Sequence, residues 1–343
     1  MNLPDPAPVR DLIEAFRRSK TMFTAVSMGV FDRLHDAPAT AADMSGALGA
    51  NAGALERLLD GCAALGLLCK RDGVYTNDPV AETYLVSASP HSLRGYIRYS
   101  DDALYPAWDH LDDAVRDGTH RWMQTFGLEG PIFNHFFRTD EAMREFLRGM
   151  HGWGMLTSPK VVAAFDLGRF RRMVDLGGAT GHLIIAACER YPELRGVVFD
   201  LPRAAAHARE YVAASTASAR IEVAEGDFFE DELPAGDLYS VGQILHDWSE
   251  EKIVLLLRRI YRRLPETGAL LVAEKLLNDD GVGPVPANMQ SLNMLVVTEG
   301  KERSLTEYTR LLRRAGFGPV EGVRTGAYLD AVLAVKLSGW LKT

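Results

Sequence analysis

The sequence is short of cysteine, of positive charge and of long apolar runs. Its three cysteines stand at no metal-binding spacing, and we interpret them as reduced core residues of a cytoplasmic protein. The net charge of -8 argues against nucleic acid as the main partner, because phosphate binding needs a basic surface. No apolar run is long enough to span a bilayer, and residues 1–20 lack the apolar segment of a signal peptide. These absences exclude membranes and nucleic acid from the expected partners.

The length of 343 residues predicts two domains, and the first half is mainly helical. Residues 8–160 have apolar side chains at helical spacing, interrupted at 68–77 by two short runs around Asp72-Gly73 that predict a hairpin. Three helices followed by a hairpin is the order of a winged helix. Because its second and third helices lack a basic face, we expect residues 1–90 to be a scaffold or dimerisation region. Residues 91–165 are expected to form a helical linker and substrate lid.

From residue 166 to 343 the pattern is that of an α/β domain. Strand-like apolar runs alternate with helical segments, which predicts a parallel sheet with helices on both faces. The last two runs, at 319–326 and 329–336, have only a short turn between them, and they predict a terminal β-hairpin. A hairpin that closes a doubly wound sheet is unlike a dinucleotide-binding domain.

The segment "VDLGGATGH" (174–182) predicts a strand that runs into a glycine-rich turn and a helix. Gly177 and Gly178 let the backbone turn sharply and approach a ligand, and Asp175 precedes them. Such a turn lies at the carboxyl edge of the sheet, where doubly wound folds bind ligands. The spacing is neither G-x-G-x-x-G nor that of a phosphate-binding loop, since no G-K-[ST] follows.

Two further acids are expected at the same edge. Asp200 follows Gly178 by 22 residues, about the separation at which a carboxylate accepts hydrogen bonds from ribose hydroxyls. Asp227, expected at the end of the third strand, could accept from an adenine amino group, with Phe228 packed on the ring. Taken alone, the glycine-rich turn could be an ordinary strand–helix connection, and each Asp could be a helix cap. Together, and with the flanking Leu201 and Gly226, they predict a site for a nucleoside-type ligand.

The motifs "DLGGATG", "VVFDLP", "EGDFF", "LHDW" and "SLNMLVVTEGKERS" resemble those of the S-adenosylmethionine-dependent small-molecule O-methyltransferases. The acetylserotonin O-methyltransferases are similar through "SLNML", "TEG.ER" and "AFDL". This resemblance implies a winged-helix-like dimerisation domain followed by a Rossmann-like methyltransferase domain. It also implies a homodimer, S-adenosylmethionine as cofactor with S-adenosylhomocysteine as product, and no metal. The implied acceptor is a phenolic or hydroxyindole hydroxyl of a small aromatic molecule.

His246, expected at the end of the fourth strand, stands where the reaction needs a base. A histidine with a pKa near ~6.5 can take the proton of an attacking phenol, and a carboxylate usually fixes its tautomer. The resemblance implies Glu274 and Glu302 for that task. The three residues also have non-catalytic interpretations. His246 could be structural, Glu274 could pair with a surface lysine such as Lys275, and Glu302 could be an acid that the helix dipole favours at the start of a helix.

The acceptor pocket is expected along a helix at 287–300. The resemblance implies that this helix lines the pocket, and we expect substrate contacts from Asp247, Met289, Asn293, Met294 and Val297, with Met150 and Trp153 closing the pocket from the helical half. Relatives often place a basic residue one turn before the histidine, to meet the cofactor carboxylate. Gln243 stands there and can still donate a hydrogen bond.

Other functions remain open from the sequence. A nicotinamide oxidoreductase is disfavoured by the glycine spacing and the terminal hairpin, and a winged-helix transcription factor by the charge. A catalytically silent binding protein is disfavoured by the histidine with both glutamates. A relative that methylates nitrogen or carbon, or that has a hydroxylase-like activity, is the main alternative.

Overall fold

The computed structural model describes residues 3–130 and 138–336, which form two compact units. The helical unit comprises Met1–Ala103 and Arg144–Gly152, and the sheet unit comprises Leu104–Met143 and Trp153–Thr343. The region 91–165, expected as a separate lid, is therefore shared between the two units. Its assignment to a lid, with functional boundaries at 90 and 165, remains a prediction. No helix in the described ranges is both long and apolar enough to cross a membrane.

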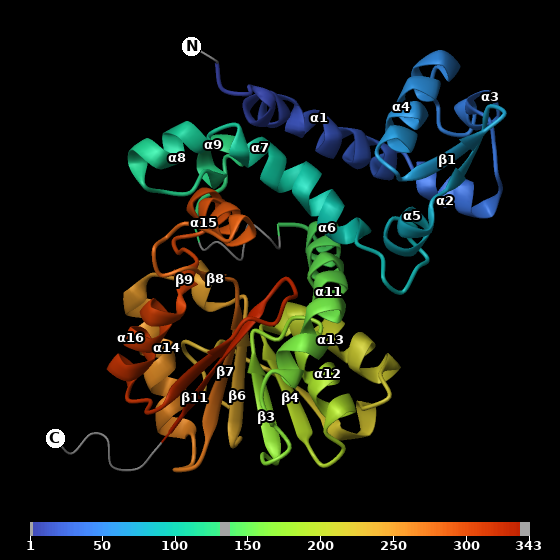
Figure 1. Ribbon diagram of the computed structural model, residues 1–343. Helices are drawn as coiled ribbons and strands as arrows, with labels where there is room; N and C mark the ends of the chain where they lie inside the picture. The colour runs from blue at the N-terminus through green and yellow to red at the C-terminus, as the bar shows by residue number, and fades with distance from the viewer. Residues whose placement is uncertain (1–2, 131–137, 337–343) are drawn as a thin grey trace. The chain divides into compact units, whose positions relative to one another are not determined.

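The helical unit has the predicted order of helices followed by a hairpin (Figure 1). Thr40 caps α3 through a capping box with Asp43, and Asp72 and Gly73 take the left-handed conformation (φ 51° and 79°) that a two-residue hairpin turn requires. The elements are α1 (Ala7–Ser27), α2 (Val30–Asp36), α3 (Ala41–Ser45), α4 (Ala52–Ala64), β1 (Leu68–Arg71), β2 (Val74–Asn77), α5 (Pro79–Tyr84) and α6 (Arg94–Tyr99).

The cysteine prediction was wrong for one residue of the three. Cys62 on α4 and Cys188 in the sheet unit are buried, as a core interpretation requires, but Cys69 on the hairpin is exposed. Side chains alternate between the two faces of a strand, and the face of β1 that bears Cys69 has no covering layer.

The helices of the sheet unit include a long one, α11, that belongs to both units. They are η1 (Ser100–Leu104, a π-helix across the unit boundary), α7 (Tyr105–Trp108), α8 (Leu111–Asp117), α9 (Trp122–Phe126), α11 (Asp140–Ala163), α12 (His182–Arg190), α13 (Pro202–Ala214), η2 (Ser218–Arg220), η3 (Leu245–Asp247), α14 (Glu250–Arg263), α15 (Val285–Val297) and α16 (Leu305–Ala315). The strands are β3 (Arg172–Leu176), β4 (Arg195–Asp200), β5 (Ile221–Glu225), β6 (Leu238–Gly242), β7 (Ala269–Glu274), β8 (Leu276–Leu277), β9 (Arg303–Ser304), β10 (Val320–Val323) and β11 (Asp330–Val335).

Among the described residues, seven strands form one mixed sheet in the order β10-β11-β7-β6-β3-β4-β5. Strands β3 to β7 are parallel, and β11 pairs antiparallel with both β7 and β10. The predicted α/β sheet with a terminal hairpin is confirmed. A separate short pair, β8 with β9, joins the segment after β7 to the segment before α16.

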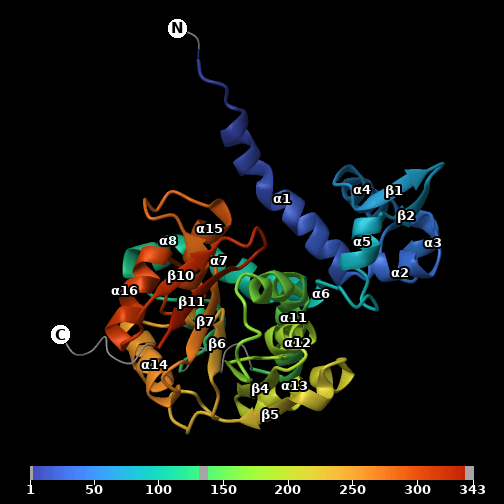
Figure 2. The same ribbon diagram turned by 60° about the horizontal axis from the view of Figure 1, so that its bottom comes forward.

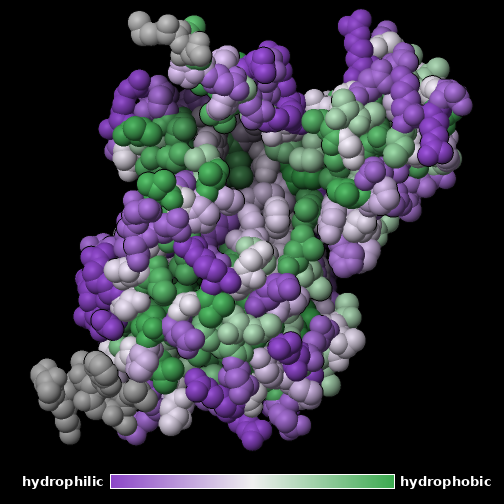
Figure 3. All heavy atoms as spheres, in the orientation of Figure 1, coloured by the Kyte–Doolittle hydropathy of each residue, from purple (hydrophilic) through white to green (hydrophobic). Residues whose placement is uncertain are grey.

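Helices cover both faces of this sheet (Figure 2), and an apolar core lies between the sheet and each helical layer. On one face the core is formed with α14 and α16, and on the other with α12, α13 and the end of α11. Hydrophilic side chains cover the outer surface of α14 and α16, at the lower left of Figure 3. This layering leaves the carboxyl ends of the parallel strands as the edge at which the predicted site residues gather.

Two predicted strand ends were wrong by a few residues. β5 ends at Glu225, so Asp227 lies in the following turn, and β6 ends at Gly242, so His246 lies on the short 3₁₀ helix η3. Gln243 has a φ of 54°, which breaks the extended conformation directly after β6. Ser249 caps α14 by accepting a hydrogen bond from the N–H of Lys252.

Candidate active site

The glycine turn after β3 is packed too closely for side chains. A Cβ on Gly177 (φ 67°) would stand 2.4 Å from Cδ1 of Ile244 and 3.4 Å from Cε1 of Phe228. A Cβ on Gly178 would stand 2.9 Å from Oδ2 of Asp175. The turn therefore brings the first-strand motif, the third-strand motif and the segment before His246 together, as the sequence predicted for one ligand site.

Asp200 ties the end of β4 to this turn. Its Oδ2 accepts from the N–H of Ala179 at 2.7 Å, and its Oδ1 accepts from the N–H of Leu201 at 2.7 Å. Burial raises the pKa of Asp200 to about 6, although the two backbone hydrogen bonds favour the charged form. Each carboxylate oxygen can accept a second hydrogen bond, so a ribose hydroxyl is compatible with this arrangement.

Asp175 lies beneath the turn rather than at its surface. Its side chain is buried, and its Oδ1 accepts a hydrogen bond of 2.5 Å from Oγ of Ser240 on β6. Burial raises the pKa of Asp175 to about 7, against the lowering effect of the Ser240 hydrogen bond. The geometry suits a group that shapes the turn, and direct cofactor contact remains a prediction.

Asp227 and Gly226 shape the third loop. Oδ1 of Asp227 accepts from the N–H of Phe229 at 2.8 Å, and the Asp227 N–H donates to Oδ2 of Asp231 at 2.8 Å. A Cβ on Gly226 would stand 2.4 Å from the Phe199 ring. These hydrogen bonds show that Asp227 stabilises the turn. Its contact with an adenine remains a prediction.

The turn that carries His246 is held at both ends by buried charged residues. Oε1 of Glu274 accepts from the N–H groups of Ile244 (3.0 Å) and Leu245 (2.8 Å). The Arg303 guanidinium donates to the carbonyl oxygens of Leu245 (3.3 Å) and Trp248 (3.4 Å). Because these contacts satisfy backbone groups of η3 that regular helix bonds leave free, they fix the position of the imidazole.

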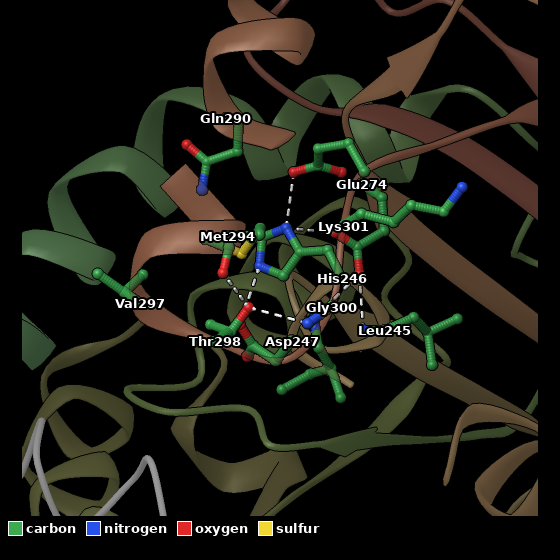
Figure 4. A network of polar contacts seen from close by, with 12 residues as sticks. Leu245, His246, Asp247, Glu274, Gln290, Met294, Val297, Thr298, Gly300 and Lys301 are labelled. Carbon is green, nitrogen blue, oxygen red and sulfur yellow. Dashed lines mark hydrogen bonds and ion pairs between the residues drawn. The ribbon is translucent and has the colours of Figure 1, made fainter. Parts of the chain in front are cut away.

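The imidazole lies between carboxylates (Figure 4). His246 Nδ1 is 2.7 Å from Oε1 of Glu302 and 3.2 Å from Oε2 of Glu274, whereas Nε2 is 3.6 Å from Oδ1 of Asp247. The structure therefore brings all three predicted catalytic residues together. Glu274 makes no ion pair with Lys275, so that alternative was wrong. The carboxylates at Nδ1 require a proton there, which leaves Nε2 to exchange a proton with a ligand.

Burial and charge act in opposite directions on this cluster. Burial lowers the pKa of His246, but the negative charges of Glu274, Glu302 and Asp247 outweigh it and raise the pKa to about 10. Burial raises the pKa of Glu274 to about 7 and that of Asp247 to about 6, and the imidazolium opposes both increases. The unliganded cluster therefore holds its proton firmly on the imidazole at neutral pH.

The same three residues could be considered as metal ligands, since one atom from each of His246, Glu274 and Glu302 lies within 4.8 Å of the others. The 2.7 Å between Nδ1 and Oε1 of Glu302 is a hydrogen-bond distance. Two atoms that bind one ion at ~2.1 Å in tetrahedral geometry stand about 3.4 Å apart. The cluster therefore fits a shared proton better than an ion.

Helix α15, which was predicted to line the acceptor pocket, packs against η3. Asn293, Met294 and Val297 are buried on it, whereas Met289 is 46% exposed. The sequence did not foresee the partner of Asn293: Nε1 of Trp108 donates to Asn293 Oδ1 at 2.9 Å. This hydrogen bond fixes the amide orientation, so that Nδ2 is the atom left to donate to a ligand.

The remaining predicted residues are placed as follows. Met150 belongs to the helical unit and Trp153 to the sheet unit, where its indole stacks on Tyr328 with ring centres 4.4 Å apart. Gln243 donates its backbone N–H to Ala273 O at 2.9 Å. Their cofactor and substrate contacts remain predictions. No sequence pattern pointed to Arg303 or Trp108, because both act through backbone or amide groups far away in the chain.

Comparison with known proteins places these features in a family. Residues 108–318 match the model of the O-methyltransferase domain, and residues 10–87 match the O-methyltransferase dimerisation domain. Acetylserotonin O-methyltransferase of Bos taurus is 41% identical, over 96% of this chain and 97% of its own length.

Two further relatives extend this comparison. A probable bifunctional dTTP/UTP pyrophosphatase/methyltransferase protein of Homo sapiens is 40% identical over 98% of this chain, which spans about half (54%) of that longer protein. The crystal structure of human N-acetylserotonin methyltransferase in complex with SAM superposes with a TM-score of 0.93 at 36% identity, covering 98% of this chain and 100% of that one. The chain therefore belongs to the O-methyltransferase family.

Proposed function

We propose that this protein transfers a methyl group from S-adenosylmethionine to a phenolic or hydroxyindole hydroxyl of a small aromatic molecule, with His246 as the base. The observation that carries the proposal is the buried imidazole with carboxylates at Nδ1 and with Nε2 left for a ligand. Glu302 and Glu274 hold the proton-bearing side of the ring, and they stabilise the imidazolium that forms when Nε2 takes a proton. The acetylserotonin O-methyltransferases among the relatives support the aromatic hydroxyl as acceptor.

The pKa of about 10 for His246 sets the proton balance. A phenol also ionises near ~10, so oxygen and Nε2 compete for one proton on nearly equal terms. The unliganded imidazole is already protonated at neutral pH, and one proton must leave the site before the oxygen can attack. The cofactor supplies an electrophilic methyl group on a positively charged sulfur, and a positive charge nearby favours loss of that proton. We expect kcat/KM to rise between pH 6 and pH 9.

The glycine turn and its acids are proposed to hold the cofactor. Asp200 is assigned to the ribose, Asp227 to the adenine, and Phe228 to packing against the base. The close approach at Gly177 supports this assignment, because a side chain there would fill the space beside Phe228 and Ile244. The human relative that was crystallised with SAM supports the identity of the ligand. Gln243 is assigned to the cofactor carboxylate, with Leu201 and Gly226 beside the nucleoside.

The acceptor is proposed to lie between α15 and η3. Met294 and Val297 offer apolar contact to a planar ring, and the thioether of Met294 adapts to its shape. Asn293 donates from Nδ2, because Trp108 occupies its Oδ1. Asp247, Met289, Met150 and Trp153 are kept as further substrate contacts.

A homodimer is proposed from the dimerisation domain and from the surface of α1. Val9, Leu12, Ile13 and Phe16 are 54–74% exposed, and their spacing places them along one side of the helix. An exposed apolar stripe of this kind marks an interface. A cytoplasmic location completes the proposal.

A methylation assay tests this function. Phenols and hydroxyindoles are incubated with S-adenosylmethionine labelled in the methyl group, and the products are analysed by mass spectrometry. We expect label on the oxygen of at least one hydroxyl compound, and none with Asp200→Ala, which also loses stabilisation by S-adenosylhomocysteine. Label on nitrogen or carbon alone would contradict the proposal and would favour a relative that methylates nitrogen or carbon.

A further inference from the structure

A second buried cation lies beside the histidine cluster and takes no part in the proposed chemistry. Lys275 directly follows Glu274 at the end of β7, and it is only 5% exposed. Lysines are almost never this deeply buried without an anionic partner. Among the described residues, no carboxylate oxygen lies within 4.0 Å of Lys275 Nζ. The ammonium therefore makes no close ion pair among these residues, and the carboxylates of Glu302 and Glu274 act on it only from a greater distance.

Two neutral groups hold the ammonium in place. Its Nζ lies 3.5 Å from the centre of the Tyr328 ring and donates to Oε1 of Gln290 at 3.1 Å. Trp153 stacks on Tyr328 with an interplanar angle of 16°, which fixes the tyrosine ring. An ammonium has three N–H donors, and these contacts use two of them. A third donor is available for a ligand.

The position of Gln290 indicates which ligand this is. Gln290, Asn293, Met294 and Val297 are spaced i, i+3, i+4 and i+7 on α15, so they share one side of the helix. This is the side that we assign to the acceptor. Lys275 also stands next to Glu274, whose Oε2 faces the imidazole. The nucleoside-binding turn follows β3, from which β6 separates β7.

We propose that Lys275 binds an anionic group, of the carboxylate type, on the methyl acceptor. The native acceptor is then an aromatic hydroxyl compound that carries a negative charge. Burial supports this inference, because it lowers the pKa of Lys275 to about 8, and a bound anion restores the charged form. A charge-assisted hydrogen bond in a buried site discriminates by about 10-fold or more against a neutral analogue. The inference rests on the proposed function.

The test compares two acceptors that differ in charge and by one methyl group, 5-hydroxyindole-3-acetate and its methyl ester. Binding to the S-adenosylhomocysteine-loaded parent protein is measured by calorimetry and needs no turnover. We expect the acid to bind at least ~10-fold more tightly than the ester. Equal affinity would overturn the inference, whereas methylation of neither compound would count against the proposed function and leave this binding comparison valid.

Variants locate the effect. Lys275→Met should reduce the acid-to-ester affinity ratio about 10-fold, Lys275→Arg should retain most of the ratio, and Lys70→Met, on β1 of the helical unit, should leave it unchanged. The cofactor is the other source of a carboxylate. If Lys275→Met instead weakens S-adenosylhomocysteine and leaves 5′-methylthioadenosine, which lacks the carboxylate, unaffected, then Lys275 serves the cofactor and the acceptor assignment is wrong.

Discussion

His246 Nδ1 lies 2.7 Å from Oε1 of Glu302, and both side chains are buried. The pair links two segments separated by 56 residues, and it determines which imidazole nitrogen is left for the ligand. Oε2 of Glu274 is farther from Nδ1, at 3.2 Å, and Oε1 of Glu274 accepts hydrogen bonds from the backbone at η3. The two glutamates therefore differ in role.

Glu302→Gln should lower kcat by about 10²-fold, because the amide no longer offers a negative charge to the imidazolium. The acidic limb of the kcat/KM profile should also move to lower pH, because the variant lacks one of the negative charges that raise the pKa of His246. Glu274→Gln should cause a smaller loss, because its amide oxygen can still accept from Ile244 and Leu245. Exposed Glu299→Gln is the matched control. Equal, pH-independent losses in both variants would mean that the glutamates act through folding.

Asp175→Asn should stabilise the unliganded protein at high pH. The pKa of Asp175 rises from 3.8 to about 7 on folding, so its contribution to stability is complete below pH 4 and is lost as the pH rises through 7. The asparagine can still accept from Ser240 and cannot ionise. Urea unfolding at pH 8.5 should show a gain on the order of 2–4 kcal/mol over the parent, much larger than at pH 5. A pH-independent difference would contradict the buried charge.

Gly300→Ala should impair catalysis by displacing the turn that carries His246. The new Cβ would stand 2.2 Å from His246 O and 2.7 Å from Trp248 N, both backbone atoms that cannot rotate away. We expect kcat to fall at least ~10-fold with S-adenosylhomocysteine binding retained, because a small displacement of a reacting group is costly. Gly46→Ala, where the new Cβ meets no atom within 4 Å, is the control. Normal turnover by Gly300→Ala would show that the turn tolerates movement.

Leu12→Glu should shift the protein from dimer to monomer in sedimentation at micromolar concentration. Leu12 is 74% exposed on the apolar stripe of α1, and a charge there would be buried in the interface. Arg10→Glu, at an exposed position on α1 outside the apolar stripe, is the control for altered charge. A parent protein that already sediments as a monomer would remove the basis for this assembly.

The sequence predicted the elements better than it predicted their connections. The parallel sheet, the terminal hairpin and the meeting of His246, Glu274 and Glu302 follow from motif order, because strand ends share one edge of a sheet. The exact end of β6 could not be predicted, since it depends on the left-handed conformation of Gln243, a residue with no strong preference for it.

Contacts between distant segments were also beyond the sequence. Trp108 and Asn293 are 185 residues apart, and Lys275, which follows β7, contacts Tyr328, which precedes the neighbouring strand β11. No rule of sequence spacing predicts either of these two contacts. Cys69 was predicted to lie in the core because its neighbours in the sequence are apolar. Whether a face of a two-stranded hairpin is buried depends on which other elements pack against it.

The proposed methyl transfer requires Nε2 of His246 to accept the proton of the attacking hydroxyl. The most direct measurement is methyl transfer by His246→Ala to a series of phenols of increasing acidity, with S-adenosylhomocysteine affinity measured alongside. We expect a fall of roughly 10²–10⁴-fold for an unactivated phenol, a much smaller fall for nitro-substituted phenols that arrive ionised, and nearly unchanged cofactor affinity. A loss that is the same for every phenol, or that accompanies loss of cofactor binding, would contradict it.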